Sequence, residues 1–208
     1  MTRSPNPASR PTHALDRQGI AMPLHFVTGN PNKVREVQQI LGVEVRQVAL
    51  HLPELQSLDV DEVIRFKAEQ AYHQVGAPVL VEDSSLAFVA WNGLPGALIK
   101  WFMETVGSAG LCRMLCDETN RQAVARSSLD LYDGWQHQVF SGTVRGRIAL
   151  APRGQGGLGW DDIFIPEGHT RTFAEMTAEE KNRISMRSIA LAKLRDFLTG
   201  ATQASRLR

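Results

Sequence analysis

The sequence has little of what marks several common classes of protein. It has two cysteines and six histidines, and no group of them has the spacing of a metal site. Its formal net charge is +1 and no basic stripe with interleaved aromatic residues occurs, so neither nucleic acid nor an anionic membrane is expected as a partner. No apolar run is long enough to span a bilayer, and the Gly-x-x-x-x-Gly-Lys-[Ser/Thr] motif of P-loop enzymes is absent. Any site for an anion must therefore be built locally.

The two cysteines are expected to serve packing alone. Cys112 and Cys116 lie four residues apart in an apolar stretch that is predicted to be helical, which places them on one face. A disulfide within one helical turn has poor geometry, so we expect both side chains in the core.

What is present suits one globular domain. The chain has 208 residues, of which 43% are hydrophobic and 22% charged, enough for one sizeable core, with or without a small additional lobe. Residues 1–22 are rich in proline and arginine and lack the apolar segment of a signal peptide, so we expect a disordered tail, or a start at Met22. Residues 200–208 are expected to be frayed, which leaves residues 23–199 as the domain.

Helices and strands alternate early in the chain, and a hairpin follows. Strands are predicted at residues 24–28, 43–50, 78–81, 86–91, 123–132 and 138–150, and helices at residues 30–41, 59–75, 98–104, 110–117 and 178–198. Asn30 and Pro31 suit the cap and first position of a helix, and Asp59 and Glu62 have the spacing of a capping box. The pattern predicts an α/β fold with a mixed, twisted sheet.

Three cations lie where local rules disfavour them. Lys33 falls in the first turn of a helix, where it opposes the helix dipole unless an anion docks there. Lys67 interrupts the apolar stripe of residues 59–75, and Arg187 interrupts that of the last helix. Each also has an ordinary explanation: a solvated lysine, a lysine that reaches the surface, and a buried ion pair. Three such cations on different elements favour a shared anion site.

Three carboxylates suit a metal that binds next to phosphates. Glu82 and Asp83 follow a predicted strand, and carboxylates at a strand's carboxyl end are well placed for a ligand crevice, although a solvated strand end is the alternative. Glu54 lies in a loop. Oxygen ligands together with triphosphate oxygens are the usual way to hold Mg²⁺.

Five short motifs occur in order along the chain. They are Phe-Val-Thr-Gly-Asn-x-x-Lys-x-x-Glu at residues 26–36, Val-Glu-Asp-Ser at 81–84, Gly-Leu-Pro-Gly at 93–96 followed by Ile-Lys-Trp-Phe at 99–102, Gly-Trp-Asp at 159–161, and Ala-Glu-Met at 174–176 followed by Glu-Lys-Asn at 180–182. Together they resemble the inosine triphosphate pyrophosphatase family, also called XTP/dITP diphosphatases or Ham1-like proteins. The resemblance runs from about residue 24 to residue 198.

The resemblance implies an elongated mixed sheet flanked by helices, two lobes with a central active-site cleft, and a homodimer. It implies a cytoplasmic enzyme that hydrolyses a nucleoside triphosphate, such as ITP, dITP or XTP, to the monophosphate and pyrophosphate. The cofactor would be Mg²⁺, with Mn²⁺ as a substitute.

The resemblance also implies roles for particular residues. Glu54 and Asp83 would bind the metal, and Asp83 would be the catalytic proton acceptor for the attacking water. The substrate-binding residues would fall into three groups: a phosphate group of Thr28, Gly29, Asn30, Pro31, Asn32, Lys33, Lys67, Ser84 and Lys100; a base and sugar group of Leu158, Gly159, Trp160 and Asp161; and a group closing over the base, Lys181, Met186 and Arg187.

Two positions depart from the family pattern, and both lie where the base would be held. Met186 stands where the family usually has histidine, and methionine cannot donate a hydrogen bond to a 6-keto purine. Leu158 stands where the family usually has phenylalanine, and leucine stacks less well. We expect pyrophosphohydrolysis with weaker or shifted base preference; a pyrophosphatase for another nucleotide and a non-catalytic nucleotide-binding module are the alternatives.

Overall fold

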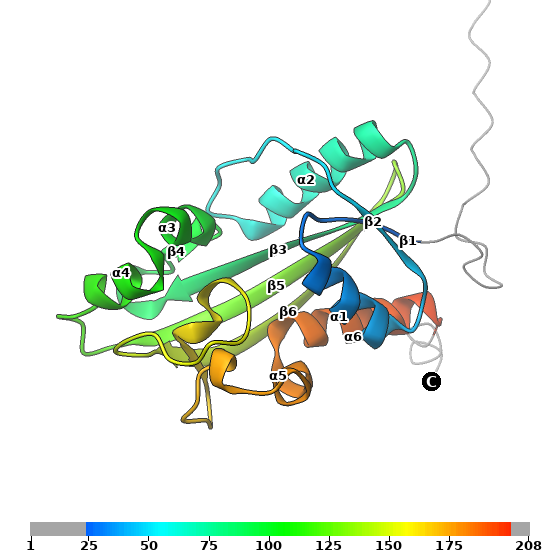
Figure 1. Ribbon diagram of the computed structural model, residues 1–208. Helices are drawn as coiled ribbons and strands as arrows, with labels where there is room; N and C mark the ends of the chain where they lie inside the picture. Colours follow the sequence, from blue (N-terminus) through cyan, green and yellow to red (C-terminus); the bar gives the residue numbers. More distant parts are fainter. Residues whose placement is uncertain (1–23, 201–208) are drawn as a thin grey trace, which may run out of the picture.

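The computed structural model describes residues 24–200, which form an α/β fold around one seven-stranded sheet (Figure 1). The tails predicted at residues 1–22 and, apart from Gly200, at residues 200–208 lie outside the described part. The strands are β1 (Leu24–Val27), β2 (Val45–Val48), β3 (Val79–Phe88), β4 (Pro95–Gly96), β5 (Gln122–Tyr132), β6 (His137–Ile148) and β7 (Phe164–Pro166). Their order is β2-β1-β3-β5-β6-β7, with β4 paired to β3. β1 pairs in parallel with β2 and β3 and the other pairs are antiparallel, so the predicted mixed sheet is confirmed.

The helices flank this sheet. They are α1 (Pro31–Leu41), α2 (Val60–Val75), α3 (Ile99–Thr105), α4 (Gly107–Met114), α5 (Ala178–Ile184) and α6 (Met186–Leu198), with 3₁₀ turns η1 (Val89–Trp91), η2 (Gly159–Asp162) and η3 (Phe173–Glu175). None of the helices within residues 24–200 has the length and apolarity needed to cross a membrane.

The predicted starts of α1 and α2 are confirmed. The side chains of Asn30 and Asp59 accept hydrogen bonds from the backbone N–H groups two residues ahead, as N-caps do. The reciprocal half of the capping box is absent at α2, because the Glu62 carboxylate accepts instead from the hydroxyl of Ser57.

Two boundary predictions were wrong. Residues 78–81 and 86–91 were predicted as separate strands, but β3 runs unbroken from Val79 to Phe88, because β5 pairs with it along its whole length. Residues 178–198 were predicted as one helix, but the chain breaks at Ser185, whose extended backbone ends α5 and whose side chain caps α6. Ser185 accepts from the N–H of Ser188, and such a bond favours a new helix start over continuation.

The prediction for the cysteines is half right. Cys112 is buried on α4, with its thiol 3.2 Å from the carbonyl oxygen of Ala149. Cys116 is exposed because α4 ends at Met114, before the turn that would have placed the two side chains on one face.

The hydrophobic core is divided between two lobes, as predicted. Successive residues of β3 face opposite sides of the sheet: Leu80 packs in a cluster with α1 and α6, while Val79 and Val81 pack in a cluster with α2. The other lobe holds a third cluster, to which α3, α4 and β7 contribute. Figure 1 shows α3 and α4 at one end of the long strands and α1, α2 and α6 toward the other. The strands β3, β5 and β6 therefore connect the lobes.

Candidate active site

A cleft of about 1000 Å³ brings most of the predicted site residues together. The end of β1, the loop at residues 50–56, α2, β3, α3, η2, α5 and the start of α6 all contribute to its lining. All the predicted site residues line it except Pro31 and Asn32, which are exposed in the first turn of α1. The structure thus assembles in one cavity side chains that are distant in the sequence.

The turn between β1 and α1 forms one wall of the cleft. The Thr28 hydroxyl accepts a hydrogen bond from the backbone N–H of Asn30 at 3.1 Å, and the Asn30 side chain accepts from that of Asn32 at 2.9 Å. A Cβ atom at Gly29 would meet no protein atom within 4 Å, so the backbone there is open to a ligand. A helix start preceded by an open, small-residue turn suits a phosphate.

The three cations singled out by the sequence converge on one residue, Glu82. The Lys33 ammonium lies 3.4 Å from Glu82 Oε2, and the Arg187 Nε donates to Glu82 Oε1 at 2.7 Å. The Lys67 ammonium donates to the backbone carbonyl of Glu82 at 2.8 Å. The ordinary explanation for Arg187 therefore holds, since its guanidinium also pairs with Glu36 at 2.6 Å. All three cations line the cleft.

Burial and the neighbouring charges have opposite effects on the pKa values of the residues in this cluster. Burial alone would raise the pKa of Glu82, but the charges of Arg187 and Lys33 and the hydrogen bonds of Arg187 and Ser127 outweigh it and lower that pKa to about 2. Burial lowers the pKa of Lys33, and the nearby carboxylate of Glu82 offsets this only in part. Despite burial, Glu82 and Glu36 raise the pKa of Arg187. Glu82 is therefore a buried anion held by cations.

Asp83 was predicted to follow the end of its strand. This prediction is wrong, because the strand continues past it. It lies in the middle of β3, half-buried, with Oδ1 accepting from the N–H of Ser84 at 2.9 Å. Because Phe26 pairs with Leu80 and β1 ends at Val27, Asp83 nevertheless lies beyond the carboxyl end of the neighbouring parallel strand. The ligand crevice expected at such a position is formed by β1 rather than by β3.

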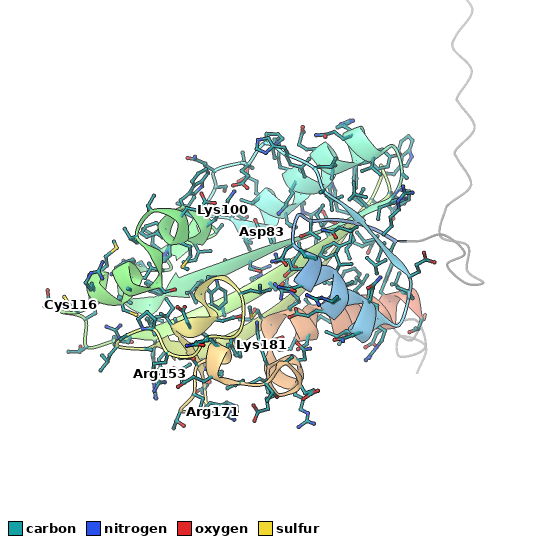
Figure 2. The ribbon with its side chains drawn as sticks, in the orientation of Figure 1. Asp83, Lys100, Cys116, Arg153, Arg171 and Lys181 are labelled. Carbon is teal, nitrogen blue, oxygen red and sulfur yellow. The ribbon has the colours of Figure 1, made fainter. Side chains whose placement is uncertain are left out.

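The opposite wall of the cleft carries Glu54 and Lys100. Lys100 on α3 pairs with the Glu54 carboxylate from the loop and lies 3.8 Å from Glu104. The hydrogen bond with Glu54 raises the pKa of Lys100 despite slight desolvation. In Figure 2 Lys100 is labelled beside α3, close to Asp83.

The carboxylates fit a magnesium ion only in part by themselves. Within residues 24–200, no group of three or more His, Cys, Asp or Glu side chains could hold a metal ion. Glu54 and Asp83 line the same cleft and present hard oxygen donors. Mg²⁺ in nucleotide sites is commonly held by one or two carboxylates plus substrate phosphates. Two carboxylates in a cleft with phosphate-suited cations match that pattern.

Large apolar side chains line the far end of the cleft. Leu158, Trp160 and Met186 line it, and Trp160 and Met186 are buried. A buried ion pair supports this end: the Lys181 ammonium lies 2.5 Å from Asp161 Oδ2, which also accepts from the N–H of Leu158. Such a pocket suits a flat, uncharged ring, with the ion pair ordering the loop that covers it.

Sequence reasoning missed the partners that organise the cations. Glu82 was considered only as a strand-end acid and Glu36 only as the last residue of the first motif. Ser127, whose hydroxyl donates to Glu82 at 2.9 Å, was not considered. The signal that could have led to Glu82 was the need of three misplaced cations for an anion.

Comparisons with known proteins agree on one family. A sequence model described as the Ham1 family matches residues 24–197. A dITP/XTP pyrophosphatase of Thermococcus kodakarensis is 44% identical over 180 residues, which cover 85% of this chain and 97% of that protein. Inosine triphosphate pyrophosphatase 1 of Trypanosoma cruzi is 49% identical over 175 residues, covering 82% and 89%. The solved structure of a HAM1 protein from Coxiella burnetii superposes with a TM-score of 0.74 at 30% identity, covering 85% of this chain and 99% of that one.

Proposed function

This chain belongs to the Ham1 family, and from that premise we propose that it is a nucleoside-triphosphate pyrophosphatase for non-standard purine nucleotides such as ITP, dITP and XTP. The observation that carries the proposal is the polarity of the cleft. One end gathers Lys33, Lys67 and Asp83, while the other is apolar around Trp160 and Met186. A triphosphate and a base joined by a sugar present the same two kinds of surface.

The protein groups supply the proton acceptor and the positive charge. Asp83 accepts the proton of the water that attacks the phosphoanhydride. Lys33, Lys67 and Lys100 stabilise the negative charge that develops on the phosphate oxygens, the electrostatic contribution that dominates phosphoryl transfer. Water adds to one phosphorus, the bond to the bridging oxygen breaks, and the nucleoside monophosphate and pyrophosphate leave.

Glu54 and Asp83 are the residues that would hold Mg²⁺, or Mn²⁺ in its place, together with triphosphate oxygens. A bound divalent ion supplies charge neutralisation and Lewis acidity at the phosphates. The hard oxygen donors of both side chains and their shared cleft support this assignment.

Base selection falls to the apolar end of the cleft. Lys181 and Arg187 both line the cleft and keep N–H donors, since Lys181 is paired through one contact with Asp161 and Arg187 is engaged by Glu82 and Glu36 through its Nε and Nη1. Met186 provides contact area but no donor. We therefore propose that this enzyme distinguishes 6-keto purines from adenine less sharply than a site with a donor at position 186 would.

The resemblance also leads us to propose a cytoplasmic homodimer. Light scattering coupled to size exclusion would measure the mass of the purified chain against the 23.0 kDa of one copy. A mass of one copy at working concentration would refute the dimer without touching the proposed chemistry.

Pyrophosphate release tests the function directly. ITP, XTP, dITP, ATP, GTP, CTP and UTP are each incubated with the protein, with and without Mg²⁺. Mg²⁺-dependent release that favours ITP or XTP is the expected result. Release that favours another base would keep the chemistry and change the substrate, while no release from any of them would favour a nucleotide-binding module.

A further inference from the structure

Glu82 is the common partner of cations from three different elements, two of which contact its buried carboxylate. Lys33 comes from α1, Lys67 from α2 and Arg187 from α6, and each contacts Glu82 through a different atom or group. The residue is only 3% exposed and lies on the central strand β3. No other carboxylate of the cleft has this set of contacts among the residues that the structure describes.

Glu82 is turned toward these cations. Its Oε1 accepts from Arg187 Nε at 2.7 Å and from the Ser127 hydroxyl at 2.9 Å. Its Oε2 is buried and has no hydrogen-bond partner within residues 24–200, but it faces the Lys33 ammonium at 3.4 Å. Asp83, the next residue, points to the other face of the sheet, since successive strand residues alternate. Proton abstraction is thus assigned to Asp83, and Glu82 serves other groups.

Without a carboxylate at this point the cations would repel one another. Lys33 lies close enough to both Lys67 and Arg187 for their charges to lower its pKa. Like charges gathered in a partly buried cleft repel one another more strongly than they do in water, because the effective dielectric constant is lower. A fixed anion among them removes that repulsion before any ligand arrives.

We propose that Glu82 is a positioning residue of the phosphate site, which holds Lys33 and Arg187 through its side chain and Lys67 through its backbone carbonyl so that the cations are assembled in advance of the triphosphate. The inference rests on the proposed function for the identity of the ligand. Arg187 acts here as a member of this scaffold, clamped between Glu82 and Glu36. Preorganised charges of this kind need no rearrangement when the ligand binds.

A role for Glu82 in positioning the cations and a role through its negative charge alone predict opposite effects of Glu82→Gln on the binding of an anionic ligand. If Glu82 acted only through its charge, Glu82→Gln would remove one negative charge beside the phosphates and strengthen pyrophosphate binding. If Glu82 positions the cations, the same change releases Lys33 and Arg187 and weakens binding, while Lys67 stays on the backbone carbonyl. We expect a loss of about 10–100-fold, the usual effect of removing a residue that orients the groups in contact with a ligand.

The experiment measures binding of inorganic pyrophosphate with Mg²⁺ by calorimetry, and KM and kcat for ITP alongside. Glu82→Gln is compared with Asp130→Asn, a matched control. Asp130 is also a buried acid with a close polar partner, since its Oδ2 lies 2.6 Å from His137 Nδ1, and it lies on the neighbouring strand β5 outside the cleft. We expect the control to change the melting temperature but to keep pyrophosphate affinity and both kinetic constants within about twofold.

A third variant keeps the charge and moves it. Glu82→Asp shortens the side chain by one methylene, so that one carboxylate can no longer reach Lys33 and Arg187 together. Weaker pyrophosphate binding in Glu82→Asp would support the positioning role of Glu82. This test remains valid even if Glu82→Gln does not fold. Binding in Glu82→Asp equal to that of the wild type would overturn the proposal.

The remaining outcomes are equally decisive. Equal or tighter pyrophosphate binding in Glu82→Gln would overturn the proposal, and so would an equal loss in Asp130→Asn, because the effect would then follow general destabilisation. A wild-type protein that binds no pyrophosphate would overturn it as well. A wild-type protein that binds pyrophosphate but releases none from any nucleoside triphosphate would refute the proposed function and leave the role of Glu82 standing.

Discussion

Removal of the Lys181 charge tests the reasoning about the base end of the cleft most sharply. In the structure the Lys181 and Asp161 side chains are 8% and 3% exposed, and their charged atoms are 2.5 Å apart. Lys181→Met keeps most of the side-chain volume but leaves the Asp161 carboxylate buried with the backbone N–H of Leu158 as its hydrogen-bond donor. An unpaired buried charge is the expected outcome.

The size of the effect follows from burial. Breaking a buried ion pair by removing one partner costs about 3–5 kcal/mol. At about 2–4 °C for each kcal/mol in a domain of this size, the melting temperature should fall by roughly 6–20 °C. The double variant Lys181→Met/Asp161→Asn should recover much of this loss, because the amide can still accept from Leu158 and carries no charge.

Calorimetric or circular-dichroism melting measures the prediction. Arg171→Met is the control. Arg171 precedes α5 and pairs with Glu180, which lies on α5 next to Lys181. This pair lies at the surface, where the Arg171 side chain is 51% exposed (Figure 2). Exposed ion pairs contribute little, so its melting temperature should stay close to that of the wild type. A Lys181→Met melting temperature equal to that of Arg171→Met, or a double variant less stable than the single one, would refute the argument from the buried charge.

Three further predictions concern catalysis, base preference and pH. Asp83→Asn should lower kcat for ITP by about 10²–10⁴-fold, the usual contribution of a general base, with an unchanged melting curve; near-normal turnover would remove Asp83 from the mechanism. Met186→His adds a donor beside the base and should raise the ITP-to-ATP ratio of kcat/KM, and an unaltered ratio would contradict this assignment. Burial raises the pKa of Asp130 above its ordinary value of 3.8, although the hydrogen bond and charge of His137 and the charge of Arg65 oppose it. The stability that protonated Asp130 provides is therefore lost as the pH rises through its folded-state pKa. Asp130→Asn cannot ionise, so urea unfolding should show it gaining stability relative to the wild type from pH 4 to 7; a constant difference would show that Asp130 does not titrate in this way.

Helix starts and core strands could be read from the sequence because their causes are local. Asn30 and Asp59 cap helices through hydrogen bonds to groups two residues away, and the turn at Asp133 and Gly134 separates β5 from β6. The resemblance carried by the five ordered motifs likewise predicted the fold, the family and about half of the residues that line the cleft. Such signals need no knowledge of what lies opposite in space.

The misplaced cations show how far local reasoning extends. Their positions on predicted helices favoured a shared anion site for Lys33, Lys67 and Arg187, although each had an ordinary alternative. The sequence could not say which anion, so an ion pair and a ligand stayed open for Arg187. A charged residue within an apolar stripe indicates that it has a polar partner. Which group is that partner depends on the fold.

The sequence alone determined the class of fold, the helix caps, the family and the residues that we propose for a phosphate site. Only the tertiary structure decided that β3 is continuous, since its pairing with β5 carries it through Glu82 and Asp83. It also decided that Arg187 is clamped by Glu82 and Glu36, which lie 105 and 151 positions away in the chain. The physical reason is range: capping and periodicity act within a few residues, whereas the pairing of buried charges depends on which side chains the packed sheet and helices bring within about 4 Å.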